Sequence, residues 1–201
     1  MVNLATPVRT TDSPQRPVRV PGLSGANIES LMPDDAYYEV VDGEVYRMPN
    51  NGMEHGVRGM RLAVVLGSYV YRHNLGEVLH PDTRYVLDED EDGIRRMRGP
   101  DLSFIRRERM PLPPYPPGFV RLVPDLIVEV RSPHDTFSEL QRRINDFLEA
   151  GTRLAWLVDP LKRTVTIFAP GREPHTLDAA AELDGEEVVP GFRLSVGSIF
   201  A

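Results

Sequence analysis

An acidic residue interrupts an otherwise apolar stretch of the chain, PDLIVEVRSP, residues 124–133. Leucine, isoleucine and valine surround Glu129, and proline bounds the stretch at each end, which predicts a strand buried on both faces. A carboxylate in such a strand must be ion-paired, hydrogen-bonded or bound to a metal, because burying it alone costs several kcal/mol or more. Glu129 is therefore the first residue whose surroundings suggest chemistry.

Side chains alternate along a strand, so one face of this segment differs from the other. One face carries Asp125, Ile127, Glu129 and Arg131, whereas the other carries only leucine and valine. The first face thus presents two acids and a base from a rigid support. Taken alone, Glu129 and Arg131 fit an ion pair within the strand as well as they fit part of a metal site.

A second acid stands at the start of another predicted strand. Asp101 follows Pro100 and opens the segment DLSFI, residues 101–105. The chain thus has Pro-Asp at the beginning of one strand and Glu-x-(basic) near the end of a later one. Asp101 alone could simply cap a turn. Two carboxylates brought together would suit a divalent cation that prefers oxygen ligands.

Composition limits how such a site could be built. The chain has 201 residues, 41% hydrophobic and 26% charged, which suits one well-buried core. There is no cysteine, so any metal must be held by carboxylate, histidine, backbone or water. Lys162 is the only lysine among the 23 basic residues. A site that ordinarily uses lysine would have to use arginine here.

The net charge of −7 argues against a general polyanion-binding protein, although a local basic groove stays compatible with it. The sequence has no apolar run of transmembrane length and no apolar N-terminal segment typical of a signal peptide. We therefore expect a cytoplasmic protein without membrane contact.

The elements that would position these residues follow from hydrophobic periodicity and turn signals. We expect a disordered arm over residues 1–25 and a single domain over 26–201. Helices are predicted over 54–73 and 135–150, the second ending at Gly151. A hairpin is predicted from strands over 37–41 and 44–48, joined through Asp42-Gly43. Further strands are predicted over 77–79, 83–87, 100–105, 125–130, 154–158, 164–168, 187–189 and 192–194. An acidic turn is predicted over 88–93 and a proline-rich loop over 110–119. This order indicates a mixed central sheet flanked by helices, α/β or α+β.

The spacing of Asp101 and Glu129 resembles the PD-(D/E)xK nuclease superfamily. Further motifs resemble its bacterial family of restriction-endonuclease-like domains (Uma-type), over residues of about 27–200. These motifs are YYEVVDGEV with Glu39, EHG with His55, RGPDLSFIRRER with Asp101, PDLIVEVRSP with Glu129, LQRRINDFLEAGTRLAWLVDP with Arg143, and GEEVVPGFRLSVGSIF.

This resemblance implies a restriction-endonuclease-like fold with extra β-hairpins. It also implies a DNA endonuclease in which Asp101, Glu129 and the backbone carbonyl of Val130 hold Mg²⁺ (or Mn²⁺), and metal-activated water attacks the phosphodiester. Glu39 would be the first acid of the site, with His55 close to the acids. Nucleases of this fold often dimerise, so a homodimer is a further expectation.

The chain departs from the family pattern at its basic residue. The superfamily places lysine at the position of Arg131, and the bacterial family places it at that of Arg143; both are arginine here. Arginine cannot serve as a general base, since its pKa stays above about 12, but it can bind phosphate and stabilise charge. An alternative is therefore a nuclease-fold protein that binds nucleic acid or a protein partner without cleaving.

Simpler interpretations exist for each residue. Glu39 could be exposed in its hairpin, His55 could be a surface or capping residue, and Arg143 could lie on a solvated helix face with Arg142. A glycosidase-like use of two acids is a third function, disfavoured because a Glu129–Arg131 pair offers no acid of raised pKa. The joint occurrence of three acids and a base at family positions favours the nuclease interpretation.

Overall fold

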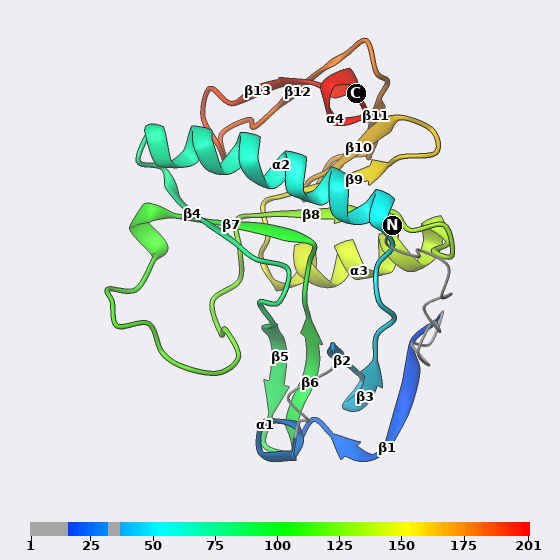
Figure 1. The fold of residues 1–201 in the computed structure, drawn as a ribbon. Helices are drawn as coiled ribbons and strands as arrows, with labels where there is room; N and C mark the ends of the chain where they lie inside the picture. Colours follow the sequence, from blue (N-terminus) through cyan, green and yellow to red (C-terminus); the bar gives the residue numbers. More distant parts are fainter. Residues whose placement is uncertain (1–15, 32–36) are drawn as a thin grey trace, which may run out of the picture.

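The computed structural model describes residues 16–31 and 37–201. These residues form a six-stranded sheet, a five-stranded sheet and a two-stranded ribbon (Figure 1). No helix in this part of the chain is long and apolar enough to cross a membrane.

The six-stranded sheet supplies the framework of the molecule. In spatial order its strands are β11 (His175–Leu177), β10 (Thr164–Phe168), β9 (Leu154–Asp159), β8 (Leu126–Val130), β7 (Leu102–Arg106) and β4 (Gly76–Leu79). Strands β8 and β9 are parallel, whereas the other neighbours are antiparallel. The predicted mixed sheet is thus confirmed, with β8 in its interior.

Helices cover both faces of this sheet (Figure 1). Helix α2 (Met53–Arg72) packs on one face through Leu62, Leu66 and Val70, against the residues of β8 that point the same way. Helix α3 (Phe137–Ala150) packs on the other face around Ile127. The alternation predicted for β8 therefore decides which helix each of its side chains meets.

The five-stranded sheet lies beside α3 and has its own small core. In spatial order its strands are β1 (Val18–Ser24), β3 (Glu44–Arg47), β2 (Tyr38–Val41), β6 (Gly93–Arg98) and β5 (Tyr85–Asp90). Val40, Val45 and Met97 are fully buried between these strands. Helix α3 contacts β5 as well as β8 and β9, so it lies between the two sheets.

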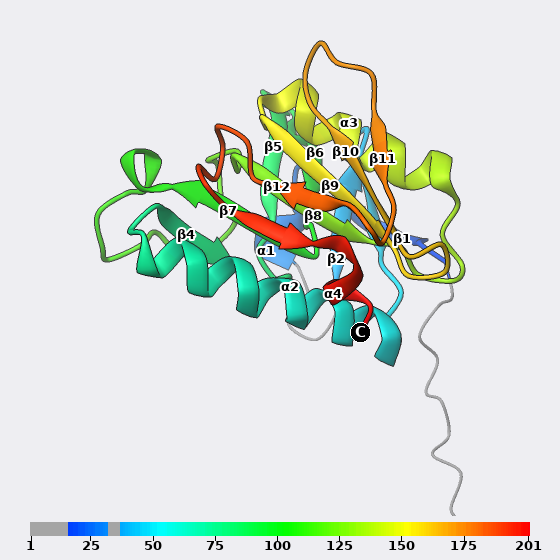
Figure 2. The same cartoon turned by 90° about the horizontal axis from the view of Figure 1, so that it is seen from above.

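The remaining elements are short. They are α1 (Ile28–Leu31), a 3-10 helix (Arg107–Arg109), β12 (Glu182–Asp184), β13 (Arg193–Ser195) and α4 (Val196–Ile199). Viewed from above, the red C-terminal segment runs along α2 (Figure 2), and Arg58 of α2 donates to the Ile199 carbonyl at 3.2 Å.

The local signals for turns and helix ends were accurate. Asp42 and Gly43 have φ of 52° and 78°, the positive values that a tight hairpin turn requires. Gly151, with φ 117°, ends α3 in the left-handed conformation. Thr136 begins α3 with a capping box, in which its hydroxyl accepts from the Glu139 N–H and the Glu139 carboxylate accepts from the Thr136 N–H.

Three predictions differ from the structure. Part of the predicted disordered arm, residues 18–24, forms β1, because it pairs antiparallel with β3; residues 1–15 lie outside the described residues. The predicted acidic turn over 88–93 is mostly strand, since β5 continues to Asp90 and pairs with the unpredicted β6. Residues 187–189 form a turn, and β13 pairs with β12 instead.

Candidate active site

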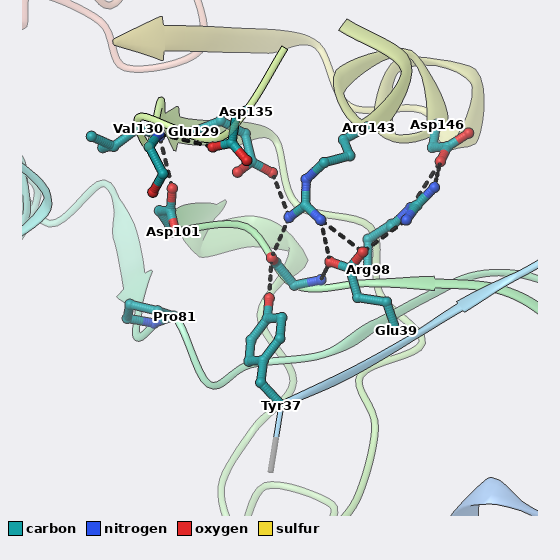
Figure 3. Close-up of polar contacts among 12 residues, drawn as sticks. Tyr37, Glu39, Pro81, Arg98, Asp101, Glu129, Val130, Asp135, Arg143 and Asp146 are labelled. Atoms are coloured by element: carbon teal, nitrogen blue, oxygen red, sulfur yellow. Dashed lines mark hydrogen bonds and ion pairs between the residues drawn. The ribbon is translucent and has the colours of Figure 1, made fainter. Parts of the chain in front are cut away.

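Five elements bring the predicted site residues to one end of β8. Glu39 comes from β2, Asp101 from the residue before β7, Glu129 from β8, Arg143 from α3 and His55 from the first turn of α2. Figure 3 shows Arg143 between Glu129 and Glu39, with Asp101 close to the end of β8. Helix α3 reaches both sheets, which explains how one of its side chains can join acids from β2 and β8.

Glu129 is a buried acid with a single cationic contact among the described residues. Its side chain is 3% exposed, and Arg143 Nη2 lies 3.2 Å from its Oε1. Burial raises the pKa of the Glu129 carboxyl to about 8; Arg143 opposes this rise, and the nearby Asp101 and Glu39 carboxylates add to it. The sequence had suggested that this acid would have no raised pKa, and the structure corrects that expectation.

Asp101 is held by hydrogen bonds and has no arginine contact among the described residues. Its Oδ2 accepts from the Val130 N–H at 2.7 Å and lies 2.9 Å from His55 Nε2. The side chains of Asp101 and His55 are 14% and 9% exposed. His55 is therefore neither a surface residue nor the cap of its helix, since Gly52 occupies the N-cap position.

Glu39 is the most strongly neutralised acid of the cluster. It is fully buried, Arg143 Nη1 lies 2.7 Å from both of its oxygens, and Arg98 Nη1 lies 2.7 Å from Oε2. Burial by itself would raise the pKa of Glu39, but Arg143, Arg98 and the Gly99 N–H outweigh it and hold the pKa below its usual value. The simpler interpretation of Glu39 as an exposed hairpin residue is wrong.

Sequence reasoning missed three members of this cluster. Arg98 is almost fully buried and also contacts Asp146 of α3, with Nη2 2.6 Å from Oδ2. The Tyr37 hydroxyl donates to the Gly99 carbonyl, and burial raises the pKa of that hydroxyl. One signal was present: Arg98 directly precedes Gly99-Pro100-Asp101, so it had to lie near any site built on Asp101.

Arg131 does not join the acids. Its Nη1 lies 2.8 Å from Asp159 Oδ2, and its Nε donates to the Asp135 carbonyl at 3.3 Å. The proposed Glu129–Arg131 ion pair is therefore wrong, because the Arg131 side chain is drawn toward β9. Of the two arginines at lysine positions, the structure brings only Arg143 to the acids, and its side chain, 14% exposed, does not lie on a solvated helix face.

A cavity of about 310 Å³ opens onto the cluster and is called the acid cavity below. Its wall includes Asp101, Glu129, Val130, Arg143 and His55. Glu39 does not line it, since that acid lies behind Arg143 (Figure 3). A ligand in the acid cavity therefore meets Asp101 and Glu129, and it meets Glu39 only through Arg143.

The donor atoms fit a hard divalent cation in kind and in charge. In the described part of the chain no three histidine, aspartate or glutamate side chains could hold a metal together. Mg²⁺ is commonly bound by one or two carboxylates and several waters, which Asp101 and Glu129 could provide. Burial is the main cause of the raised pKa of Glu129, so a cation bound beside this carboxyl would favour its ionised form. The residues present therefore fit a magnesium ion.

The fold and the cluster define a class of protein. A mixed sheet between two helices, with acids from adjacent strands beside a cavity, has the form of a restriction-endonuclease-like domain. A similar solved structure is that of a "putative nuclease belonging to DUF820" from Anabaena variabilis ATCC 29413, with TM-score 0.70 and 22% sequence identity. The match covers 85% of this chain and 93% of that one, and it shows the fold.

The family follows from the sequence match. Residues 27–197 match the profile of the Uma2 family, described as "putative restriction endonuclease". The chain belongs to this family, so the predicted family and the predicted fold are both confirmed. A comparison with curated proteins found no match.

Proposed function

We propose that this protein is a Mg²⁺-dependent endonuclease that hydrolyses DNA phosphodiester bonds at the acid cavity. One observation carries the proposal: two carboxylates, those of Asp101 and Glu129, line the same cavity, and Glu129 is buried there with one arginine contact among the described residues. A bound cation would favour the ionised form of Glu129. Membership of a family of nuclease-like proteins supports the same conclusion.

Each residue of the cavity has a distinct part in this proposal. Asp101 is oriented by the Val130 N–H and by His55, so one of its oxygens stays available to a ligand. Glu129 and the Val130 carbonyl would complete the protein's share of the metal ligands. Mg²⁺ (or Mn²⁺) bound there would lower the pKa of a water molecule and offset charge that develops on the phosphate. Arg143, which also lines the cavity, would help to stabilise that charge.

Arg143 cannot replace a lysine as a proton acceptor. Burial lowers its pKa, but Glu129 and Glu39 outweigh this effect and hold the pKa well above its usual value. Its two terminal nitrogens are also engaged with Glu39, Glu129 and the Gly99 carbonyl. Its proposed role is therefore electrostatic, with the proton of the attacking water leaving to solvent.

The direct test is a cleavage assay on supercoiled plasmid and on single-stranded DNA, in Mg²⁺, Mn²⁺ or chelator. We expect metal-dependent cleavage by the natural protein and none by Asp101→Ala. Asp82→Asn, which removes an exposed acid from the same cavity, should cleave like the natural protein. Cleavage that persists in Asp101→Ala would contradict the proposal. The homodimer is still a prediction, which analytical ultracentrifugation of the same sample checks.

A lysine at position 143 should increase the cleavage rate. Arg143→Lys supplies a group that can lose its proton, and general acid–base help contributes about 100-fold or more where it operates. Single-turnover cleavage at saturating Mg²⁺ measures the change, and Arg142→Lys on the same helix is the matched control. An unchanged rate in Arg143→Lys would show that no proton acceptor is missing.

The alternative is a nuclease-fold protein that binds nucleic acid or a protein partner without cleavage. The three-way engagement of Arg143 favours it, because this side chain ties Glu129 to a structural cluster. DNA binding that is insensitive to chelator, with no cleavage in any metal even for Arg143→Lys, would support this alternative.

A further inference from the structure

A second cavity adjoins the acid cavity and is of a different chemical kind. It measures about 480 Å³ and runs between α2 and β4, the edge strand of the six-stranded sheet. We call it the α2–β4 groove. The two cavities share Asn51, His55, Pro81 and Asp101 in their walls. A ligand at Asp101 can therefore extend directly into the groove.

The α2–β4 groove is apolar and open to solvent. Gly56, Gly59 and Ala63 line it on the α2 side, with Met60, Val64 and Tyr71 beside them. These last three side chains are 60%, 58% and 56% exposed. Asp101, at the junction with the acid cavity, is the one Asp, Glu, Lys or Arg among the described residues of its lining. The groove thus suits an apolar group and, among its described lining residues, offers no lysine or arginine to a phosphate.

The acid cavity, in contrast, has cations available at its entrance. Arg16 and Arg142 both line it and are exposed. Neither forms an ion pair or hydrogen bond with another described residue, although both help to lower the pKa of Glu139 in the same wall; Arg143, in contrast, is engaged by Glu39 and Glu129. Exposed arginines beside recessed acids suit the phosphates of a strand whose backbone enters the cavity.

The depth of the acids argues against a closed duplex as the ligand. The side chains of Asp101 and Glu129 are only 14% and 3% exposed. In a duplex the bases are stacked inside and cannot reach an apolar surface beside the backbone; an unpaired nucleotide can turn its base outward onto such a surface. Apolar and aromatic side chains next to a basic groove are the usual platform for unpaired bases.

We propose that the substrate is an unpaired DNA strand. Its backbone lies in the acid cavity near Arg16 and Arg142, and the base next to the reacting phosphate lies in the α2–β4 groove. This inference rests on the proposed nuclease function, which it sharpens by naming the form of the nucleic acid. It accounts for the position of the apolar groove directly beside Asp101.

Gly59 allows the groove to be filled without disturbing the fold. A Cβ built at Gly59 meets no atom within 4 Å, so a side chain there would project into open space. Leucine is also a better helix former than glycine, by about 0.8 kcal/mol. Gly59→Leu should therefore fold normally and block the groove. Ser68→Leu is the matched control, because Ser68 is an exposed residue of α2 that does not line the groove.

The test measures the affinity of a fluorescent oligonucleotide by anisotropy, with Ca²⁺ in place of Mg²⁺ to prevent cleavage. We expect the single strand to bind at least about tenfold more tightly than the duplex of the same sequence. Gly59→Leu should weaken single-strand binding by about tenfold, the equivalent of one stacked base, and Ser68→Leu should not. Equal affinity for both forms, or no effect of Gly59→Leu, would overturn the proposal.

Two further measurements separate this proposal from the nuclease function itself. Arg142→Ala should lower the salt dependence of single-strand binding by about one phosphate contact, whereas Arg153→Ala, at the opposite end of the parallel strands, should not. Weaker single-strand binding by Gly59→Leu with no cleavage of any DNA would retain the groove and reject the nuclease. Metal-dependent duplex cleavage that Gly59→Leu does not affect would retain the nuclease function and reject the role of the groove.

Discussion

The acid cluster has two halves that differ in how their charge is balanced. In the inner half, Glu39 and Asp146 are joined by Arg98, and Arg143 closes the arrangement from α3 (Figure 3). In the outer half, Asp101 has hydrogen bonds but no arginine among the described residues, and Glu129 has one contact at 3.2 Å. The inner acid has a lowered pKa and the outer Glu129 a raised one, although both are buried.

This difference shows how a buried acid that stabilises the fold can be distinguished from a buried acid that binds a ligand. A buried acid with two guanidinium partners is neutralised within the fold and holds elements together. A buried acid with incomplete compensation is unfavourable unless a proton or a cation joins it. The inner half is therefore expected to stabilise the protein, and the outer half to bind a ligand at some cost in stability.

The largest expected effect is the loss of the inner acid. Glu39→Gln leaves Arg98 and Arg143 buried with too little negative charge, which should cost about 3–5 kcal/mol of unfolding free energy. Thermal denaturation should then shift downward by roughly 6–20 °C. The control is Glu44→Gln on neighbouring β3, which affects an exposed pair with Arg19 and a hydrogen bond from the Tyr46 hydroxyl but leaves no buried charge behind. Equal melting temperatures for the two variants would remove the distinction between the halves.

An outer acid should behave in the opposite way. Asp101→Asn should weaken Mg²⁺ binding by about 100-fold or more, yet keep most of the stability, because asparagine can still accept from the Val130 N–H. Calorimetric titration with Mg²⁺ and a thermal melt of the same sample measure both quantities. Asp82→Asn should bind Mg²⁺ like the natural protein. A melting temperature as low as that of Glu39→Gln would mean that Asp101 is structural.

The raised pKa of Glu129 predicts a particular dependence on pH. Between about pH 5 and 8 the unfolded chain has lost this proton while the folded protein still holds it, so stability should fall as pH rises. Below this range both states are protonated, and above about pH 8 the contribution is fully lost. Urea denaturation in chelator should show this decrease of unfolding free energy with pH, and Glu129→Gln should reduce it. An equal pH dependence in Glu129→Gln would assign the effect to another group. Mg²⁺ binding below pH 8 should also release a proton.

The smallest effect is expected at the beginning of α3. Thr136→Ala removes the capping box and should cost about 1 kcal/mol, measured by urea denaturation. Affinity for Mg²⁺ should stay the same, since α3 keeps its packing through Leu140, Ile144 and Phe147. This variant shows what a general loss of stability does to the site. A parallel loss of Mg²⁺ affinity would show that the outer half depends on helix stability.

The sequence predicted the acids better than it predicted their partners. An acid in an apolar run is visible without a structure, and so are an Asp-Gly turn and a glycine that ends a helix. The choice of Arg143 over Arg131 as the partner of Glu129 is not visible, because it depends on α3 crossing both sheets. Arg98 and Asp146 were missed for the same reason: their contact spans 48 positions of the chain.

Two of the unpredicted strands, β1 and β6, have a related explanation. Strand β6, with sequence GIRRMR, is too basic to indicate a buried strand locally, and Arg98 is buried there only because Glu39 and Asp146 neutralise it. Strand β1 contains proline and has mostly exposed side chains. It is a strand because β3 offers a free edge with which it pairs. Tertiary pairing, and not local propensity, formed both strands.

The bond between Arg143 and Glu39 joins residues 104 positions apart, and Arg143 is also the partner of Glu129. During synthesis, β2 and β8 are complete before Arg143 has been added. A growing chain therefore contains Glu39 and Glu129 before it contains the guanidinium group that joins them. The inner half of the cluster can therefore assemble only after α3 has folded against both sheets.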